Sequence, residues 1–174
     1  MSSFSPRTTR PSANDPYWTK TTYGGYNRCI IGSPTAWSGS VLANCTGYAW
    51  GRWLEMLNLT DCSLSTGNAE NWYNYNDGYQ RGNVAKLGAI CCWANGPYSG
   101  LGHVGIVEEV LGNYSFRMSN SAWDAYIFRY EYVADCRNWD RYDFQGFIYP
   151  PVDFDIDEWL FYWATKRKKI KVVM

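Results

Sequence analysis

The sequence has very little histidine and no long apolar run. One histidine, His103, occurs in 174 residues, so any mechanism that needs an imidazole depends on this residue. No apolar stretch approaches the roughly 20 residues that a membrane-spanning helix requires. The N-terminus, residues 1–15, is polar and rich in Ser, Thr and Pro, and it lacks the apolar core of a secretory signal peptide. These absences predict a protein that is made in the cytoplasm and has no transmembrane segment.

The cysteines lack the spacing of a metal site. They do not form paired Cys-x-x-Cys sets, so we expect neither a zinc site nor another bound metal or cofactor. In a reducing cytosol they should remain mostly thiols. If the protein works outside the cell, disulfide bonds are the alternative. The six are Cys29, Cys45, Cys62, Cys91, Cys92 and Cys136.

The formal net charge is zero, but it is unevenly distributed. Five of the 16 basic residues lie within 166–171, and the 11 that remain face 16 acidic residues, a net charge of −5 on the rest of the chain. Binding to phosphates needs a basic face. An acidic body therefore argues against nucleic acid as a partner.

Aromatic residues are abundant, at 18% of the chain, and hydrophobic residues reach 46%. Such a composition excludes an intrinsically disordered chain, and the length fits one compact domain with short appendages. We expect a flexible N-terminal arm over residues 1–16 and a domain over 17–151. Residues 152–174 follow as an aromatic helix with a basic tail, because acidic residues at its start and basic ones at its end suit the helix dipole.

The order of the predicted elements is that of an α+β fold. A helix over 45–57 follows the N-capping residue Asn44 and has apolar residues at helical spacing. We expect this helix to pack on an antiparallel β-sheet. A second short helix is expected near 68–73, and the predicted strands are 89–94, 103–110, 114–123 and 144–149.

Cys45 is the cysteine best placed to act as a nucleophile. It opens the predicted helix, and a helix N-terminus stabilises a thiolate, as does a nearby imidazolium such as that of His103. Because the thiolate is the reactive form, this position suits nucleophilic catalysis. The alternative is that both residues are structural. The other five cysteines lie in apolar strands or in loops.

Asn120 is the candidate for the group that orients the imidazole. It lies on the apolar face of its strand, where an amide is costly to bury without a hydrogen bond. The strand that begins at His103 is joined to it by a short turn at 111–113, so a hairpin brings the two residues close. Glu108 and Glu109 are weaker rivals, because they lie far along the strand of His103.

Six segments, in this order along the chain, resemble the CHAP domain (cysteine, histidine-dependent amidohydrolase/peptidase) as carried by phage endolysins and virion-associated peptidoglycan hydrolases. The resemblance runs from about residue 17 to 150. The segments are NCTGYAWGR at 44–52, GNAENWY at 67–73, LGAI at 87–90, GHVGIVE at 102–108, SNSAW at 119–123 and FQGFIYP at 144–150.

The resemblance implies a papain-like α+β fold with Cys45 as nucleophile and His103 as base. Asn120 falls where the family places an orienting Glu, Asp or Asn. Many members have Glu there and a further Asn two residues on, where this chain has Ala122. Some members bind calcium through an Asp-rich loop before the cysteine. Residues 26–44 contain no Asp or Glu, so we expect no such site.

The function implied is hydrolysis of an amide bond of bacterial peptidoglycan through an acyl-enzyme. The resemblance favours an N-acetylmuramoyl-L-alanine amidase over an endopeptidase, made in the host cytoplasm and acting at the cell wall. The C-terminal tail is a candidate contact for other virion or wall-binding components. The alternatives are a non-catalytic wall-binding or structural virion protein and a cysteine protease that acts on proteins. Candidate substrate-binding residues are Asn44, Tyr26, Trp72, Trp93, Tyr98 and Trp123.

Overall fold

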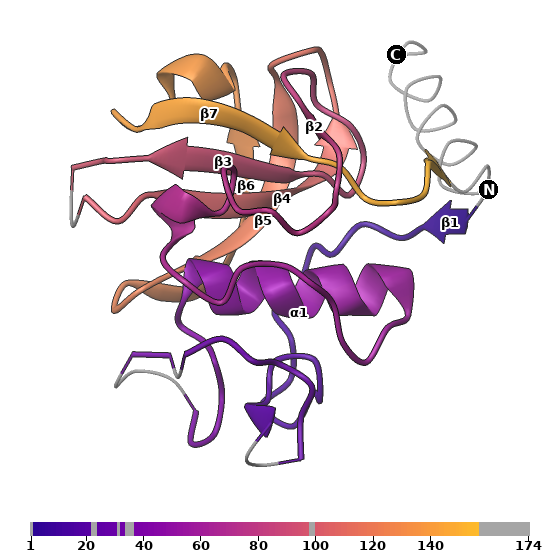
Figure 1. The fold of residues 1–174 in the computed structure, drawn as a ribbon, viewed down its shortest axis with the longest axis vertical. Helices are drawn as coiled ribbons and strands as arrows, with labels where there is room; N and C mark the ends of the chain where they lie inside the picture. The colour runs from indigo at the N-terminus through magenta and orange to yellow at the C-terminus, as the bar shows by residue number, and fades with distance from the viewer. Residues whose placement is uncertain (1, 22–23, 31, 34–36, 98–99, 157–174) are drawn as a thin grey trace, which may run out of the picture.

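The computed structural model describes residues 2–21, 24–30, 32–33, 37–97 and 100–156. Its main features are one α-helix, α1 (Cys45–Leu57), and a six-stranded antiparallel sheet in the order β2-β7-β3-β4-β5-β6 (Figure 1). The expected α+β fold is confirmed. The strands are β2 (Arg81–Gly82), β3 (Ile90–Ala94), β4 (His103–Val110), β5 (Phe116–Ala122), β6 (Tyr126–Val133) and β7 (Asp143–Ile148).

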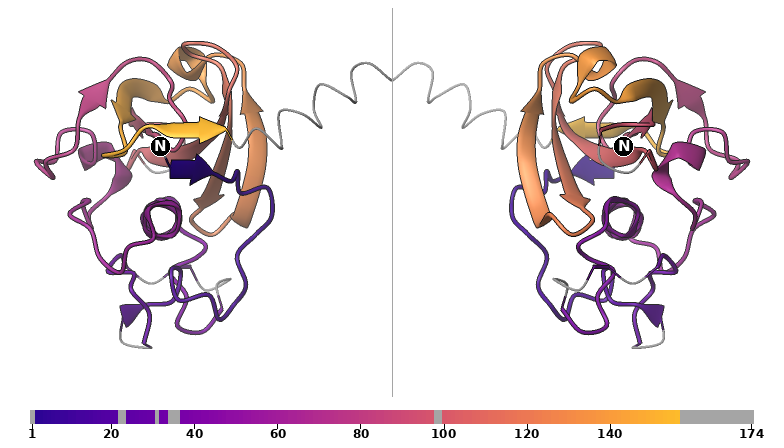
Figure 2. Two further views of the ribbon diagram at one scale, coloured as in Figure 1. Left: turned by 90° about the vertical axis from the view of Figure 1, so that its right-hand side faces the viewer. Right: turned by 90° about the vertical axis from the view of Figure 1, so that its left-hand side faces the viewer.

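Helix α1 has the bounds that the sequence predicts. The side-chain oxygen of Asn44 accepts hydrogen bonds from the backbone N–H groups of Thr46 and Gly47, and Asn58 ends the helix in a left-handed conformation with φ 52°. The helix lies between the sheet on one side and the described loop residues between 17 and 44 on the other, as the view along its axis shows (Figure 2). This position explains why residues 46–54 are all buried.

Both faces of the sheet carry a core. One face packs against α1 through β3 and β4, which contribute residues such as Cys92, Val104 and Ile106. The opposite face carries Trp93, Phe116 and other apolar residues, covered by the segment around the short 3₁₀ helix η3 (Cys136–Asn138). Buried on both faces, the central strands are held rigidly, which suits them to position side chains at their ends.

The N-terminal residues are packed on the domain, which corrects the expected flexible arm. Strand β1 (Ser2–Phe4) pairs in parallel with β8 (Phe154–Ile156), and the rings of Phe4 and Phe154 lie 5.0 Å apart. Phe4 is only 1% exposed. The sequence did not reveal this packing because the partners of the segment are distant in the chain.

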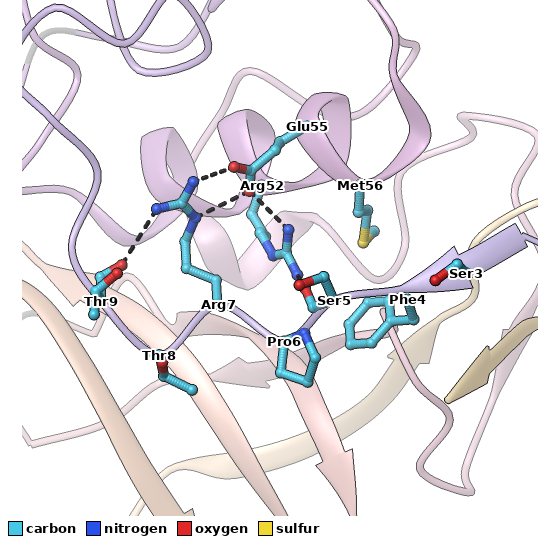
Figure 3. A pocket seen from close by; sticks show the side chains of 10 residues that line it. All are labelled: Ser3, Phe4, Ser5, Pro6, Arg7, Thr8, Thr9, Arg52, Glu55 and Met56. Carbon is cyan, nitrogen blue, oxygen red and sulfur yellow. Dashed lines mark hydrogen bonds and ion pairs between the residues drawn. The ribbon is translucent and has the colours of Figure 1, made fainter. Parts of the chain in front are cut away.

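Two arginines fasten the same N-terminal segment to α1 (Figure 3). Arg7 forms an ion pair with Glu55, and its backbone N–H donates to Glu108 at 2.9 Å. Arg52 donates to both carboxylate oxygens of Glu108 at 2.9 Å and to the carbonyl of Ser5 at 2.7 Å. Glu108 is fully buried, where an unpaired charge would be costly. The donors from α1 and from the N-terminal segment compensate its charge.

Other elements differ from those that the sequence predicts. The second helix is a single 3₁₀ turn, η2 (Ala69–Asn71), and strand β6 was not predicted at all. The expected C-terminal helix and basic tail lie mostly outside the described residues. The described part of this segment, residues 152–156, contains strand β8. Within the described residues, no helix is long and apolar enough to cross a membrane.

Candidate active site

Cys45 is the first residue of α1, and its side chain is partly exposed. Burial of the thiol raises its pKa to about 11, against the lowering effect of backbone N–H groups from Val104, Thr46 and Cys45 itself. These N–H groups surround the position where negative charge would develop on the sulfur. The helix start thus supplies donors for a thiolate, as expected from the sequence.

His103 is the first residue of β4, and it is 4% exposed. Because Val104 follows it directly and also directs its N–H toward the sulfur of Cys45, the imidazole and the thiol belong to the same end of the sheet. Burial lowers the pKa of His103 to about 4, and the hydrogen bond with Asn120 opposes this shift. The neutral imidazole can accept a proton, which is what a general base must do.

Asn120 contacts the imidazole as the hairpin predicted. Its side-chain oxygen lies 3.2 Å from Nε2 of His103, and the residue is fully buried in β5. The next residue, Ser121, accepts a hydrogen bond from the backbone N–H of Asn44 at 3.0 Å. This bond ties the start of α1 to β5, so the elements that carry Cys45 and Asn120 are held together.

The arrangement has the elements of nucleophilic catalysis. Burial disfavours a charged thiolate and a charged imidazolium taken separately, so the resting pair is a neutral thiol and a neutral imidazole. Transfer of the thiol proton to the imidazole would produce an activated sulfur beside backbone donors. The site can therefore attack an electrophilic carbonyl.

Comparison with known proteins identifies the family. A family model described as the CHAP domain matches residues 34–122, which include all three residues of this site. The chain belongs to the CHAP-domain family. Its members are, in general, cysteine-dependent hydrolases.

Solved structures show distant likenesses to this CHAP domain. One is an N-acetylmuramoyl-L-alanine amidase from Staphylococcus aureus, with 24% identity and a TM-score of 0.46 over 60% of this chain and 30% of that one. Another is Ly7917, with 15% identity and a TM-score of 0.48 over 81% of this chain and 63% of that one. The chain thus spans less than two thirds of the length of either protein. No curated protein matches the sequence.

An aromatic cluster beside His103 was not foreseen. The rings of Trp139 and Tyr142 stack on each other at 5.4 Å and lie 5.3 and 5.8 Å from the imidazole. Both are half-buried, and Trp93 packs behind them at 4.6 Å from Trp139. They follow η3, far from the catalytic segments in the chain, and no periodic pattern marked them. Their rings keep water from one side of the imidazole.

Two residues of β6 also reach the site of the CHAP domain and were missed with that strand. The hydroxyl of Tyr126 donates to the side-chain oxygen of Asn120 at 2.8 Å. The side-chain NH₂ of the same asparagine donates to Glu131 at 2.7 Å. Asn120 therefore has partners on both ends of its amide. A correct assignment of β6 would have placed both residues next to β5.

The candidate substrate-binding residues lie in different environments. Trp72 and Trp93 are fully buried and belong to the core rather than to a groove wall, which corrects that prediction. Tyr26 packs against Tyr17 at 5.9 Å, and the side-chain oxygen of Asn44 serves the helix cap. Trp123 is 54% exposed at the turn between β5 and β6 and remains available to a ligand. Tyr98 lies outside the described residues.

Among the described residues, no three or more His, Cys, Asp and Glu side chains are grouped so that they could hold a metal ion. The two acidic rivals for the third catalytic position have other partners. Glu108 pairs with Arg52, and Glu109 lies 3.5 Å from Arg117 at the surface. Neither contacts the imidazole in the hydrogen bonds of the structure, whereas Asn120 does.

Proposed function

We propose that this CHAP domain hydrolyses an amide bond of bacterial peptidoglycan, with Cys45 as nucleophile, His103 as base and Asn120 as the group that orients the imidazole. One observation carries the proposal: the chain's single histidine is hydrogen-bonded to a buried asparagine and begins the strand whose next N–H reaches the helix-start cysteine. Membership of the CHAP-domain family supports peptidoglycan as the substrate.

The reaction would proceed in two halves. His103 accepts the thiol proton while the sulfur of Cys45 bonds to the amide carbonyl carbon, and the developing oxyanion is stabilised by the backbone N–H of Cys45. Collapse of this intermediate breaks the carbon–nitrogen bond, and the imidazolium returns its proton to the leaving amine. Water, deprotonated by His103, then hydrolyses the thioester and regenerates the thiol.

The bond that is cut belongs to the same proposal. The bond between muramic acid and L-alanine and a bond between two amino acids of the stem or cross-bridge require the same cysteine and histidine. We favour the amidase reaction, in a phage-encoded enzyme, because the sequence segments resemble those of phage endolysins. The choice depends on the shape of the substrate-binding surface, to which we assign Trp123, 54% exposed at the turn between β5 and β6, as an aromatic contact.

Digestion of purified peptidoglycan from Gram-positive bacteria tests the proposal. The wild type should release muropeptides whose masses identify the bond that is cut, and Cys45→Ala should release none. Cys62→Ala, which removes another partly buried thiol outside the three catalytic residues, serves as the matched variant and should retain the same products. If the wild type cleaves a protein such as casein but no wall, the chain is a protease. If it sediments with walls and releases nothing, it is a wall-binding protein.

A further inference from the structure

Glu131 lies directly behind the residue that holds the catalytic imidazole. Its carboxylate accepts a hydrogen bond from the side-chain NH₂ of Asn120 at 2.7 Å, on the side of the amide away from His103. Both Glu131 and Tyr126 belong to β6, which pairs with β5 in a register that sets Met118 opposite Glu131. The contact therefore depends on the pairing of β5 with β6, whose register shifts only after Asn120, rather than on a loop.

These contacts fix the orientation of the Asn120 amide. A carboxylate can only accept hydrogen bonds, so it requires the NH₂ end of the amide to face it. Rotating the amide by half a turn would place the amide oxygen against the Glu131 carboxylate and the NH₂ against the imidazole. The hydroxyl of Tyr126, which donates to the amide oxygen at 2.8 Å, would also lose its acceptor. Burial makes such mismatches costly.

The amide orientation in turn selects the tautomer of His103. An amide oxygen is an acceptor, so the ring nitrogen that it faces, Nε2, must carry the hydrogen when the imidazole is neutral. The hydrogen is then absent from Nδ1, which becomes the ring nitrogen able to accept the proton of the Cys45 thiol. With the amide reversed, Nε2 would face a donor, and Nδ1 would carry the hydrogen and be unable to act as base.

We propose that Glu131 is a positioning residue of the active site: through Asn120 it keeps His103 in the tautomer that can deprotonate Cys45, with Tyr126 as the second anchor. The inference rests on the proposed function. In this arrangement a neutral asparagine contacts the imidazole and the negative charge lies behind it on the neighbouring strand. As His103 becomes protonated during the reaction, that charge also stabilises the imidazolium through the polarised amide.

Kinetics of three variants on solubilised peptidoglycan test the role. Glu131→Ala removes the acceptor, so kcat should fall by about tenfold to a hundredfold, within the range that a positioned base contributes. KM should change little, because Glu131 lies behind Asn120 rather than in the groove. Glu131→Gln keeps an accepting oxygen and should recover most of the lost kcat. Glu109→Gln removes a surface carboxylate of β4, on the far side of β5 from Glu131, and should leave kcat unchanged.

Moving the negative charge from position 131 to position 120 provides a second test. In Asn120→Asp two carboxylates would face each other where the wild type has a 2.7 Å hydrogen bond, and their repulsion should lower kcat. Combining Asn120→Asp with Glu131→Gln places one carboxylate against the imidazole and a donor behind it. The double variant should therefore be faster than Asn120→Asp alone. If the second substitution gives no rescue, the two residues do not act as a unit.

The tautomer itself can be observed without any substrate. Because the chain has one histidine, a ¹⁵N-histidine NMR spectrum of protein without a polyhistidine tag contains a single imidazole. The wild type should show the Nε2–H form, and Glu131→Ala a mixture of the two forms. If Glu131→Ala is not folded, Tyr126→Phe, which removes the second anchor of the Asn120 amide, carries the same comparison.

The two readouts separate the proposals. A wild type that does not hydrolyse peptidoglycan overturns the proposed function, while its tautomer still decides whether Glu131 positions His103. A folded Glu131→Ala with wild-type kcat and an unchanged Nε2–H spectrum would overturn the role of Glu131.

Discussion

Cys45 and His103 are each surrounded by protein and have only a few hydrogen-bonding partners. Burial raises the pKa of Cys45 to about 11 and lowers that of His103 to about 4, so neither is charged near neutral pH. The proton must then move from sulfur to nitrogen as the substrate is attacked. This contrasts with a pair that rests as thiolate and imidazolium, and the difference can be measured.

The pH profile follows from the lowered pKa of His103. Below that pKa the imidazole is protonated and cannot accept the thiol proton, so kcat/KM should fall on the acid side near pH 4 instead of near 6.5. Initial rates between pH 3 and 8, with circular dichroism at each pH to confirm folding, give the profile. Trp139→Ala should admit water to the imidazole and move the acid limb upward. A wild-type limb at or above 6.5 would contradict the neutral pair.

Two adjacent glutamates of β4 should differ sharply in their effect on stability. Glu108 is fully buried and paired with Arg52, so Glu108→Gln leaves the buried guanidinium with Glu55 as its remaining ion-pair partner and should cost about 3 kcal/mol of unfolding free energy, the lower end for a broken buried pair. Glu109 pairs with Arg117 at the surface, where both side chains are nearly half exposed, and Glu109→Gln should cost under about 1 kcal/mol. Urea unfolding measures both, and equal losses would show that the Arg52 pair is not the cause.

Among the secondary-structure elements, α1 and β4 were predictable because their signals are local. Asn44 caps the helix, apolar residues repeat along it, and a Gly-rich loop precedes the strand of His103. The same signals selected Cys45 and His103 as candidates, and the hairpin predicted the contact between Asn120 and His103 that the structure shows.

Strand β6 was missed although its sequence carries a strand signal. Aromatic residues recur with a period of two at 126, 128, 130 and 132, but β6 is an edge strand in which nearly all residues are half-exposed, so burial does not separate its two faces. Tyr126 and Glu131 were lost with it. The aromatic cluster of Trp139 and Tyr142 was also not predicted, since it is formed only by tertiary contacts with His103.

The glycines of α1 have a packing role that helix propensity alone would misjudge. A Cβ on Gly51 would lie 2.6 Å from the carbonyl oxygen of Tyr17 and from the indole nitrogen of Trp18. Gly51→Ala should therefore destabilise the domain by about 1–3 kcal/mol through overpacking, although alanine favours an isolated helix. Gly67→Ala, whose Cβ would meet only Ser65 at 3.5 Å, should be close to neutral. Thermal unfolding compares the two, and a stabilised Gly51→Ala would contradict the close packing of the loop on α1.

For the whole molecule, the pairing of β1 with β8 connects the beginning of the described chain to the segment that follows the last strand of the main sheet (Figures 1 and 2). Phe4 lies inside this junction, in contact with Phe154, and the Arg52 guanidinium lies 5.3 Å from its ring. The junction is joined to the C-terminal half of α1 by Arg52 and Glu55, whereas Cys45 is the first residue of the helix. Stability and catalysis should therefore respond separately to its loss.

Phe4→Ala tests this separation. Removing a ring that is 1% exposed should lower the unfolding free energy by about 3–5 kcal/mol and the melting temperature with it. At a temperature where the variant remains folded, its kcat on peptidoglycan should match the wild type, because the substitution leaves the contacts of Cys45, His103 and Asn120 in place. Ser3→Ala changes a neighbouring exposed residue of the same strand and should alter neither quantity by much. An unchanged melting temperature for Phe4→Ala would mean that the N-terminal segment is not part of the folded domain. A large loss of kcat in the folded variant would mean that the junction also supports the catalytic end of α1.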